Sequence, residues 1–325
     1  MNSLRLILMG TGPFAVPSFD ALHRSRHSVA AVITKPEPPV KSRKGPPPAP
    51  VRTWAQEQGL RLLDPASINA PEAVATLQEL ASDLLVVCDY GQILRPAPLA
   101  AAKLGGINLH GSLLPKFRGA APVQRALIEG ETETGVTVIH MTPKLDGGPI
   151  LGTVATPITE TETAGELEER LSHLGVDLVL DCVERLSTWD GGESLGVTQE
   201  DSLTTRAPRL SKQEAELDFC KNYDEISCHV RGMQPWPVAF SHLRIRDNRP
   251  PLRIAVLEVA KSEQEAGGLA PGQLTGGKSL VVVVGDGTME ILRVRPAGKR
   301  EMTGAEFMRG YQLPDGTTFE RVDGS

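Results

Sequence analysis

The sequence predicts an α/β domain with a mostly parallel, twisted sheet, followed by a small antiparallel β-barrel domain. Over the first 190 residues, β-rich runs alternate with stretches of helical periodicity, which is typical of parallel strands joined by crossover helices. Residues 188–208 contain few apolar side chains, and beyond them short β-rich runs are separated by Gly, Pro and Asn turns. The chain of 325 residues is long enough for two separate cores.

The first domain is expected to contain strands that are apolar along their whole length. DLLVVCDYG (83–91) and TGVTVIHM (134–141) are continuous apolar runs, as expected for strands that helices cover on both faces. Residues 164–186 predict a long amphipathic helix whose first turns are acidic, which suits the positive end of a helix dipole. The expected strands are residues 4–10, 29–34, 60–63, 83–91, 105–111 and 134–141.

The change of texture near residue 189 places the expected domain boundary. We expect a first domain over 1–188, a linker over 189–208 and a second domain over 209–325. The second domain should contain short strands in PVAFSHLRI, PLRIAVLEV, SLVVVVGDG and MEILRVRPA, with short helices at 223–232 and 304–310.

Composition and charge exclude several classes of protein. No apolar run approaches the roughly 20 residues that span a bilayer, and the apolar stretch near the N-terminus is too short for a secretory signal. The four cysteines form no Cys-x-x-Cys pair, which argues against a zinc cage and a disulfide framework. Cytoplasmic residence is therefore the expectation. The net charge of −6 argues against nucleic-acid binding by the whole surface.

The turn GTGPFA (10–15) matches the G-x-G-x-x-A dinucleotide fingerprint between a strand and a helix. A nucleotide-dependent oxidoreductase is thus one hypothesis. Pro13 and Pro17 disturb the helix N-terminus that would hold a pyrophosphate, and no acid stands at the end of the second strand, at Thr34 and Lys35, to bind a ribose. A tight strand-to-helix turn of small residues is the favoured interpretation.

Three polar side chains stand among apolar runs in INLHGSLLP (107–115) and LDGGPI (145–150). Asn108 and His110 share one face of a strand by the two-residue repeat, and Asp146 follows the next strand. If that strand ended at the same rim of the sheet, an amide, an imidazole and a carboxylate would meet there. Taken singly, His110 could be a core histidine, and Asn108 or Asp146 could bind a nearby turn.

The chain resembles the folate-dependent formyltransferase family, and within it the members that act on methionyl-tRNA. The resemblance covers nearly the whole length, and the most specific block is 105–127 together with 145–150. It departs at Gly12-Pro13, where most members have Pro followed by an acid, and at Ser42, where an arginine is common. The other segments that carry it are 9–22, 86–94, 133–151, 206–219, 231–240 and 298–313.

The resemblance implies a Rossmann-like catalytic domain and an OB-like C-terminal domain that helps to hold tRNA. It implies 10-formyltetrahydrofolate as donor and the α-amine of methionine on initiator tRNA as acceptor, with no metal. Formyl transfer passes through a tetrahedral oxyanion, which Asn108 and a protonated His110 are expected to stabilise. Asp146 is expected to favour the charged imidazole and to accept the proton of the amine. The expected folate-binding residues are Ser112, Leu113, Leu114, Pro115, Asp89, Tyr90, Gly91 and Gln92.

A basic, proline-rich segment is the expected contact with tRNA phosphates. A charge run in a loop is usually only solvated, but the resemblance favours an arm, stiffened by proline, that reaches the acceptor stem. Because only 4% of the residues are aromatic, base stacking should matter less than phosphate contacts. The protein is expected to be monomeric and to bind no membrane. The expected tRNA-binding residues of this segment are Lys35, Lys41, Arg43, Lys44 and Arg52.

Two further hypotheses remain open at this point. The same chemistry could serve the amine of a sugar nucleotide, although the basic segment and the long second domain argue against this acceptor. The chain could instead be a noncatalytic RNA-binding protein that uses its barrel. Such a protein would have no reason to assemble Asn108, His110 and Asp146 into one site.

Overall fold

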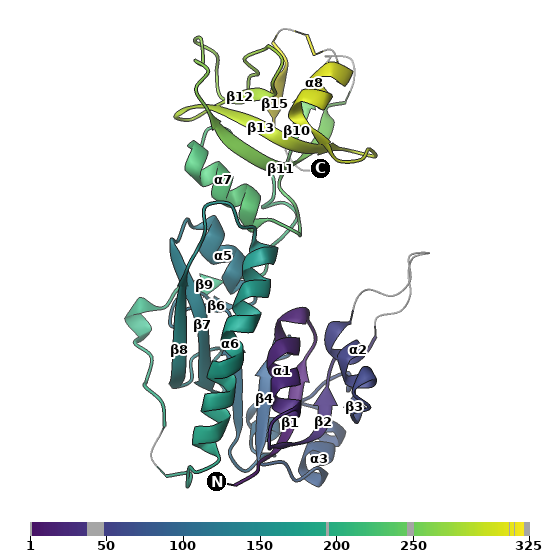
Figure 1. Cartoon of the computed structure of the whole chain (residues 1–325), viewed down its shortest axis with the longest axis vertical. Coiled ribbons are helices and arrows are strands. Elements are labelled where there is room, and N and C mark those ends of the chain that lie inside the picture. The colour runs from purple at the N-terminus through teal and green to yellow at the C-terminus, as the bar shows by residue number, and fades with distance from the viewer. Residues whose placement is uncertain are drawn as a thin grey trace. The chain divides into compact units, whose positions relative to one another are not determined.

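The computed structural model describes residues 2–37, 49–192, 195–245, 250–311, 313–314 and 316–321. The chain divides into two compact units (Figure 1). The first unit contains Met1–Pro122, Glu133–Pro157 and Leu167–Pro208, and the second contains Val123–Thr132, Ile158–Glu166 and Arg209–Ser325. Two short segments of the N-terminal half therefore belong to the second unit. The domain boundaries expected from sequence stay a prediction.

The first unit is built on a mixed sheet whose first five strands are parallel. Within the described residues seven strands form this sheet, in the order β3-β2-β1-β4-β5-β7-β8. The predicted α/β class with a mostly parallel sheet is confirmed. The strands are β1 (Arg5–Gly10), β2 (Ser28–Ile33), β3 (Leu62–Leu63), β4 (Leu84–Cys88), β5 (Gly106–His110), β7 (Glu133–His140) and β8 (Ile150–Pro157).

Strand β7 runs antiparallel to β5, which the sequence did not indicate. Thr137 pairs with His110, while His140, at the end of β7, pairs with Ile107 near the start of β5. The carboxyl ends of β5 and β7 thus lie at opposite edges of the sheet. Asp146 does follow this strand, as expected, but β7 does not end at the same rim as β5, so the loop after β7 must fold back along the sheet to reach His110.

Helices cover both faces of this sheet. On one face, Gly10 lies against the ring of Phe19 from α1 and Leu109 lies against Gly175 from α6, where a larger residue would meet the leucine. On the other face, Leu85 and other strand residues form one buried cluster with side chains of and around α3. The predicted helix over 164–186 is confirmed. The helices are α1 (Val16–His23), α2 (Pro50–Glu57), α3 (Pro71–Glu79), α4 (Pro96–Leu99) and α6 (Ala164–Leu186), with 3₁₀ turns η1 (Pro13–Ala15) and η2 (Asp201–Leu203).

The GTGPFA turn packs against the end of β4. The backbone N–H and the hydroxyl of Thr11 both donate to the carbonyl of Asp89, at 3.1 and 2.6 Å. The Asp89 carboxylate fills the space into which a Cβ on Gly12 would project. A pyrophosphate at this turn would face that negative charge, so the geometry favours a packed turn over a dinucleotide site. The departure at Gly12 from the usual family sequence makes room for this carboxylate.

The second unit is a small antiparallel barrel, as predicted. Its main sheet has the order β12-β13-β11-β10-β15, with β14 paired to β13. Residues 272–275 close it, because Gly272 N–H donates to Val283 O at 2.9 Å and Leu274 N–H donates to Thr317 O at 3.1 Å. The OB-like connectivity stays a prediction. The strands are β10 (Phe240–Arg244), β11 (Leu252–Ser262), β12 (Val281–Val284), β13 (Gly287–Pro296), β14 (Met302–Thr303) and β15 (Thr318–Glu320).

The helices of the second unit follow local capping signals. Helix α7 (Tyr223–Gly232) begins at a capping box in which the Asn222 side chain accepts from the Glu225 N–H, and the Glu225 side chain accepts from the Asn222 N–H. It coincides with the predicted helix at 223–232. The other helices are α5 (Pro122–Ile128), most of which lies in this unit, and α8 (Gly304–Tyr311). In the described part of the chain, no helix has the length and apolar character needed to cross a membrane.

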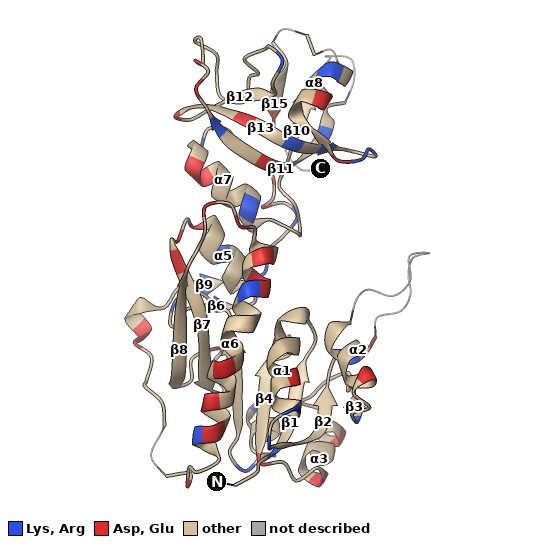
Figure 2. Ribbon diagram, viewed as in Figure 1, with Lys and Arg blue, Asp and Glu red and all other residues tan. Residues whose placement is uncertain are grey.

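A carboxyl group that is costly to ionise lies on α6. Acidic residues, red in Figure 2, occur along this helix. Among them Glu168 is part-buried, and burial, together with the negative charge of Asp89, raises the pKa of its carboxyl to about 7. The folded state therefore holds the Glu168 proton more tightly than the unfolded chain does. Stability should fall as pH rises from about 4.5 towards 7, and should not fall further on this account above that range.

Replacing Glu168 by Gln should stabilise the first unit at high pH. At pH 8 the variant avoids ionising a buried carboxyl, and we expect a gain on the order of 1–3 kcal/mol in the free energy of unfolding. Near pH 4.5 the gain should disappear, because the carboxyl is then protonated in the folded protein. Calorimetric unfolding midpoints measured from pH 4.5 to 8 check this expectation.

Glu166 provides a control on the same helix. Its pKa is lowered by hydrogen bonds from the backbone and hydroxyl of Thr163, so its charged form stabilises the fold. E166Q should therefore not raise the unfolding midpoint at pH 8. A pH-independent gain in E168Q, or an equal gain in E166Q, would contradict our account of Glu168.

Candidate active site

Strand β5 presents Asn108 and His110 on one face at the carboxyl edge of the parallel strands. Asn108 is part-buried between its neighbours Val87 of β4 and Ile139 of β7, and His110 is only 6% exposed. The Asn108 side chain forms no hydrogen bond with another described residue. A part-buried amide without a partner among the described residues is available to donate to a ligand.

A backbone carbonyl fixes the orientation of the His110 ring. Its Nε2 lies 2.9 Å from Phe117 O. Because a carbonyl oxygen can only accept, Nε2 must carry the hydrogen in this contact. The other nitrogen, Nδ1, faces Asp146 Oδ2 at 3.9 Å. This separation is too long for a direct hydrogen bond, but a bridging water or an attacking amine can contact both groups.

The loop after β7 carries Asp146 back to His110. Asp146 has a left-handed backbone conformation with φ of 47°, and its Oδ2 accepts the Gly119 N–H at 2.9 Å. Gly148 approaches the backbone of β7 so closely that a Cβ would collide with His140 O. The requirement for glycine at 148 thus arises from packing against β7.

A two-residue strand, β6 (Arg118–Gly119), connects the two halves of the site. The carbonyl just before it, Phe117 O, holds His110, and the N–H of Gly119 holds Asp146. Phe117 has φ of 59°, so this segment contains a non-glycine residue in a strained conformation next to the site. β6 pairs in parallel with β9 (Arg206–Ala207). The relative position of imidazole and carboxylate is therefore set by one short piece of backbone.

Gln199 supports the Asp146 loop and was missed by sequence reasoning. Its amide nitrogen donates to Asp146 O and to Gly148 O, both at 2.8 Å, and its oxygen accepts from Arg118 Nε at 3.0 Å. Gln199 and Arg118 are each 8% exposed. Nothing in the local sequence TQED (198–201) distinguishes this glutamine from an ordinary loop residue. Residues 197–207, expected to lie in a linker, thus belong to the first unit and contact the site.

The predicted folate turn, residues 112–115, is tied to β7. Thr137 donates its hydroxyl to Ser112 O at 2.7 Å and accepts the Leu114 N–H at 3.2 Å. Ser112 and Leu114 are buried, whereas Leu113 and Pro115 are part-exposed. Leu113 and Pro115 are thus the members of this turn that a ligand can reach.

The second predicted folate segment, residues 89–92, has mixed surroundings. Tyr90 is 2% exposed in the core, where burial raises its pKa to about 12, and its hydroxyl has no partner among the described residues. Gln92 accepts the Ile68 N–H at 2.9 Å and so serves the fold. Asp89 and Gly91 lie at the surface.

The predicted tRNA-binding residues are only partly within the described chain. Lys41, Arg43 and Lys44 lie outside the described residues. Arg52 is 11% exposed at its side chain and pairs with Asp64 at 2.7 Å and with Glu37 at 3.4 Å. Lys35 lies against Gly91, where its ammonium occupies the space of a Cβ. Two carboxylates thus already neutralise Arg52, whereas Lys35 forms no ion pair with a described carboxylate.

No group of three or more His, Cys, Asp or Glu side chains among the described residues is arranged to hold a metal ion. The candidate chemistry at this rim rests on Asn108, His110 and Asp146. An amide donor, an imidazole and a carboxylate can stabilise a developing negative charge and move a proton.

Structural comparison shows the same fold in solved structures of other proteins. A HypX structure from Aquifex aeolicus in complex with tetrahydrofolic acid has a TM-score of 0.62 at 14% identity over 99% of this chain, which spans half of HypX. An N-formyltransferase from Helicobacter canadensis, solved with folinic acid and dTDP-3-aminofucose, has a TM-score of 0.63 at 17% identity over 89% of this chain and 98% of that one. At these identities the likeness concerns the fold alone.

Sequence comparison identifies the family. Residues 3–183 match the formyl transferase family and residues 209–312 match the formyl transferase C-terminal domain. The methionyl-tRNA formyltransferase of Rhodopirellula baltica is 54% identical over 97% of this chain and 96% of its own length. That of Chromohalobacter salexigens is 39% identical over 99% of both chains. The chain therefore belongs to the formyl transferase family, within the group of methionyl-tRNA formyltransferases.

Proposed function

We propose that this protein transfers the formyl group of 10-formyltetrahydrofolate to the α-amine of methionine on initiator tRNA. The observation that carries the proposal is the arrangement of His110, whose Nε2 is fixed on Phe117 O while Nδ1 faces Asp146 across 3.9 Å. Relatives over nearly the full length, named methionyl-tRNA formyltransferases, support the choice of acceptor.

The amide of Asn108 and the Nδ1–H of a protonated His110 are the donors for the negative charge that develops on the formyl oxygen. Both groups project from the same face of β5, and the strand holds them in place before the reaction begins. Because Nε2–H is already bonded to Phe117 O, Nδ1 is the nitrogen that is free to donate. Asn108 needs no rearrangement, since it has no partner among the described residues to give up.

Asp146 is the acceptor for the proton that leaves the attacking amine. Its Oδ2 is occupied by the Gly119 N–H, which fixes the direction of the carboxylate and leaves Oδ1 as the freer oxygen. An attacking amine in the gap between His110 and Asp146 can pass its proton to the carboxylate directly or through one water. The backbone contact thus orients the Asp146 carboxylate and still leaves an oxygen to accept the proton.

The folate donor is proposed to bind beside this constellation. The unpartnered Asn108 amide, the part-exposed Leu113 and Pro115, and the exposed residues Asp89 and Gly91 combine apolar and polar groups, as small-molecule sites do. The basic segment that starts at Lys35 is proposed to contact tRNA phosphates. A sugar-nucleotide amine is the alternative acceptor considered from the sequence, and a direct comparison of turnover separates the two.

One prediction of the proposed function concerns turnover. With 10-formyltetrahydrofolate, the wild type should formylate methionyl-initiator tRNA and should not formylate dTDP-3-aminofucose at a comparable rate. Asn108→Ala should lower kcat by about 10²–10³, the usual cost of one oxyanion donor, and His110→Ala by at least as much. The measurement is incorporation of labelled formyl groups, with tRNA affinity determined separately.

His173, exposed on α6, is the matched control for His110. H173A should retain wild-type turnover. A normal kcat in H110A would contradict the proposed role of the imidazole. If the wild type preferred the sugar nucleotide, the proposed acceptor would be wrong.

A further prediction concerns Gln199, which acts through Asp146. Gln199→Glu keeps an oxygen to accept from Arg118 but loses the N–H donors to Asp146 O and Gly148 O. The Asp146 loop should then shift, and a misplacement of about 1 Å can cost up to about 10² in kcat. Rapid-mix kinetics should show this loss with tRNA affinity unchanged.

Gln78, exposed on α3, provides a control with the same substitution. Q78E should be indistinguishable from the wild type. If Q199E lowers tRNA affinity or the unfolding midpoint but leaves kcat intact, Gln199 does not position Asp146 for catalysis.

A further inference from the structure

We propose that a hollow on the barrel of the second unit binds a backbone phosphate of the acceptor tRNA, held between Arg253 and Arg295. This inference rests on the function proposed above. The hollow has a volume of about 210 Å³, below the roughly 300–1,000 Å³ of sites that hold whole small molecules. Its size suits one charged group of a larger ligand that extends beyond it. Both arginines lie in the lining together with Ala255, Pro237, Val238 and Lys299.

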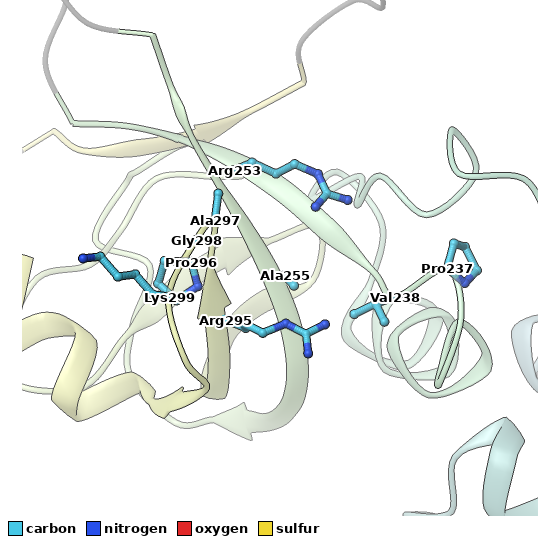
Figure 3. Close-up of a pocket in the computed structure, with 9 residues that line it drawn as sticks. All are labelled: Pro237, Val238, Arg253, Ala255, Arg295, Pro296, Ala297, Gly298 and Lys299. Carbon is cyan, nitrogen blue, oxygen red and sulfur yellow. The ribbon is translucent and has the colours of Figure 1, made fainter. Parts of the chain in front are cut away.

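The strand register brings the two arginines together. Ala255 of β11 pairs with Arg295 of β13, and Arg253 lies two residues before Ala255, so the arginines are diagonal neighbours across the strand pair. The small side chain of Ala255 leaves space between them. In Figure 3 both guanidinium groups extend in the direction of Val238 and Pro237, whereas Lys299 extends away from them.

An aromatic ring holds one of the guanidinium groups. The Cζ of Arg253 lies 3.9 Å from the centre of the Phe240 ring, which fixes its stem and head by a cation–π contact. A guanidinium held in this way loses less conformational freedom when it binds a ligand.

Neither arginine forms an ion pair with a carboxylate in the described parts of the chain. Burial and then the positive charge of Arg295 lower the pKa of Arg253, against a smaller opposite effect of Glu216. Two other arginines of this unit, by contrast, form ion pairs: Arg293 with Glu301, and Arg125 with Glu214. Two like charges side by side without a bonded acid favour an anion from outside the protein.

The neighbouring residues favour a nucleic acid over a free anion. Guanidinium groups bind phosphate oxygens in a bidentate manner, and such contacts make up much of the binding energy for nucleic acids. Trp236 precedes Pro237 of the lining and is 51% exposed. An exposed indole beside a phosphate site can stack on a base or ribose of the same strand.

The test is the double variant R253Q/R295Q. Glutamine keeps part of each stem over the barrel and removes the two charges. The Kd for methionyl-initiator tRNA should rise roughly 10- to 100-fold, and the slope of log K against log salt should decrease by about one phosphate contact. At saturating tRNA, kcat should remain within about twofold of the wild type, because the affected energy belongs to binding.

Arg293→Gln is the matched control. It removes a positive charge from the same strand as Arg295, but the guanidinium of Arg293 already forms an ion pair with Glu301. We expect less than about a threefold change in Kd. If R293Q lost as much tRNA affinity per charge as the double variant, the effect would be a diffuse electrostatic one, and the proposed phosphate site would be wrong.

Titration with inorganic phosphate distinguishes a tRNA site from a site for a free anion. Phosphate binding that the double variant abolishes, while tRNA affinity stays at the wild-type value, would overturn the assignment to tRNA. Trp236→Ala should weaken tRNA binding about fivefold or more and leave phosphate binding unchanged.

The outcomes separate this inference from the proposed function. A wild type that formylates methionyl-tRNA, combined with an unchanged Kd in the double variant, overturns the phosphate site alone. A wild type that does not formylate methionyl-tRNA overturns the proposed function itself. If the double variant fails to fold, the single variant R295Q, which uncovers no aromatic ring, decides: an unchanged Kd and salt slope overturn the proposal.

Discussion

The candidate site depends on a short stretch of backbone that binds both of its ionisable groups. Phe117 O fixes the imidazole of His110, and Gly119 N–H fixes the carboxylate of Asp146. Because only one residue separates these two backbone groups, the distance between imidazole and carboxylate cannot change without moving β6. That strand is itself paired with β9, so the geometry of the site is linked to residues almost 90 positions further along the chain.

Local and periodic signals predicted much of the fold. The apolar runs gave the buried strands, and the amphipathic period gave α6 with its observed ends. The direction of β7 was not predictable. A strand covered on both faces is a continuous apolar run, whether it pairs in parallel or antiparallel. Asn108 and His110 shared a face through the strand repeat, but their meeting with Asp146 depends on a loop that folds back, which no periodicity encodes.

The residues that sequence reasoning missed act through tertiary contacts. Gln199 stands in a polar segment that resembles a linker, and its role appears only when its amide is seen bound to two carbonyls of the Asp146 loop. Arg52 shows the converse case, since a basic residue next to a proline-rich stretch is bound by Glu37 and Asp64. Charge counted along a sequence does not reveal which charges are already neutralised.

Orientation by the backbone determines which nitrogen of His110 faces the reacting groups. A carbonyl oxygen has no proton to lose, so the contact with Phe117 keeps hydrogen on Nε2 of His110 whenever the fold persists. A carboxylate in that position would carry a charge of its own and would compete with Asp146 for the imidazole. With the carbonyl there, the nitrogen left to contact a ligand is Nδ1, which faces Asp146. The ring therefore presents its remaining nitrogen on the side where the reacting groups must lie.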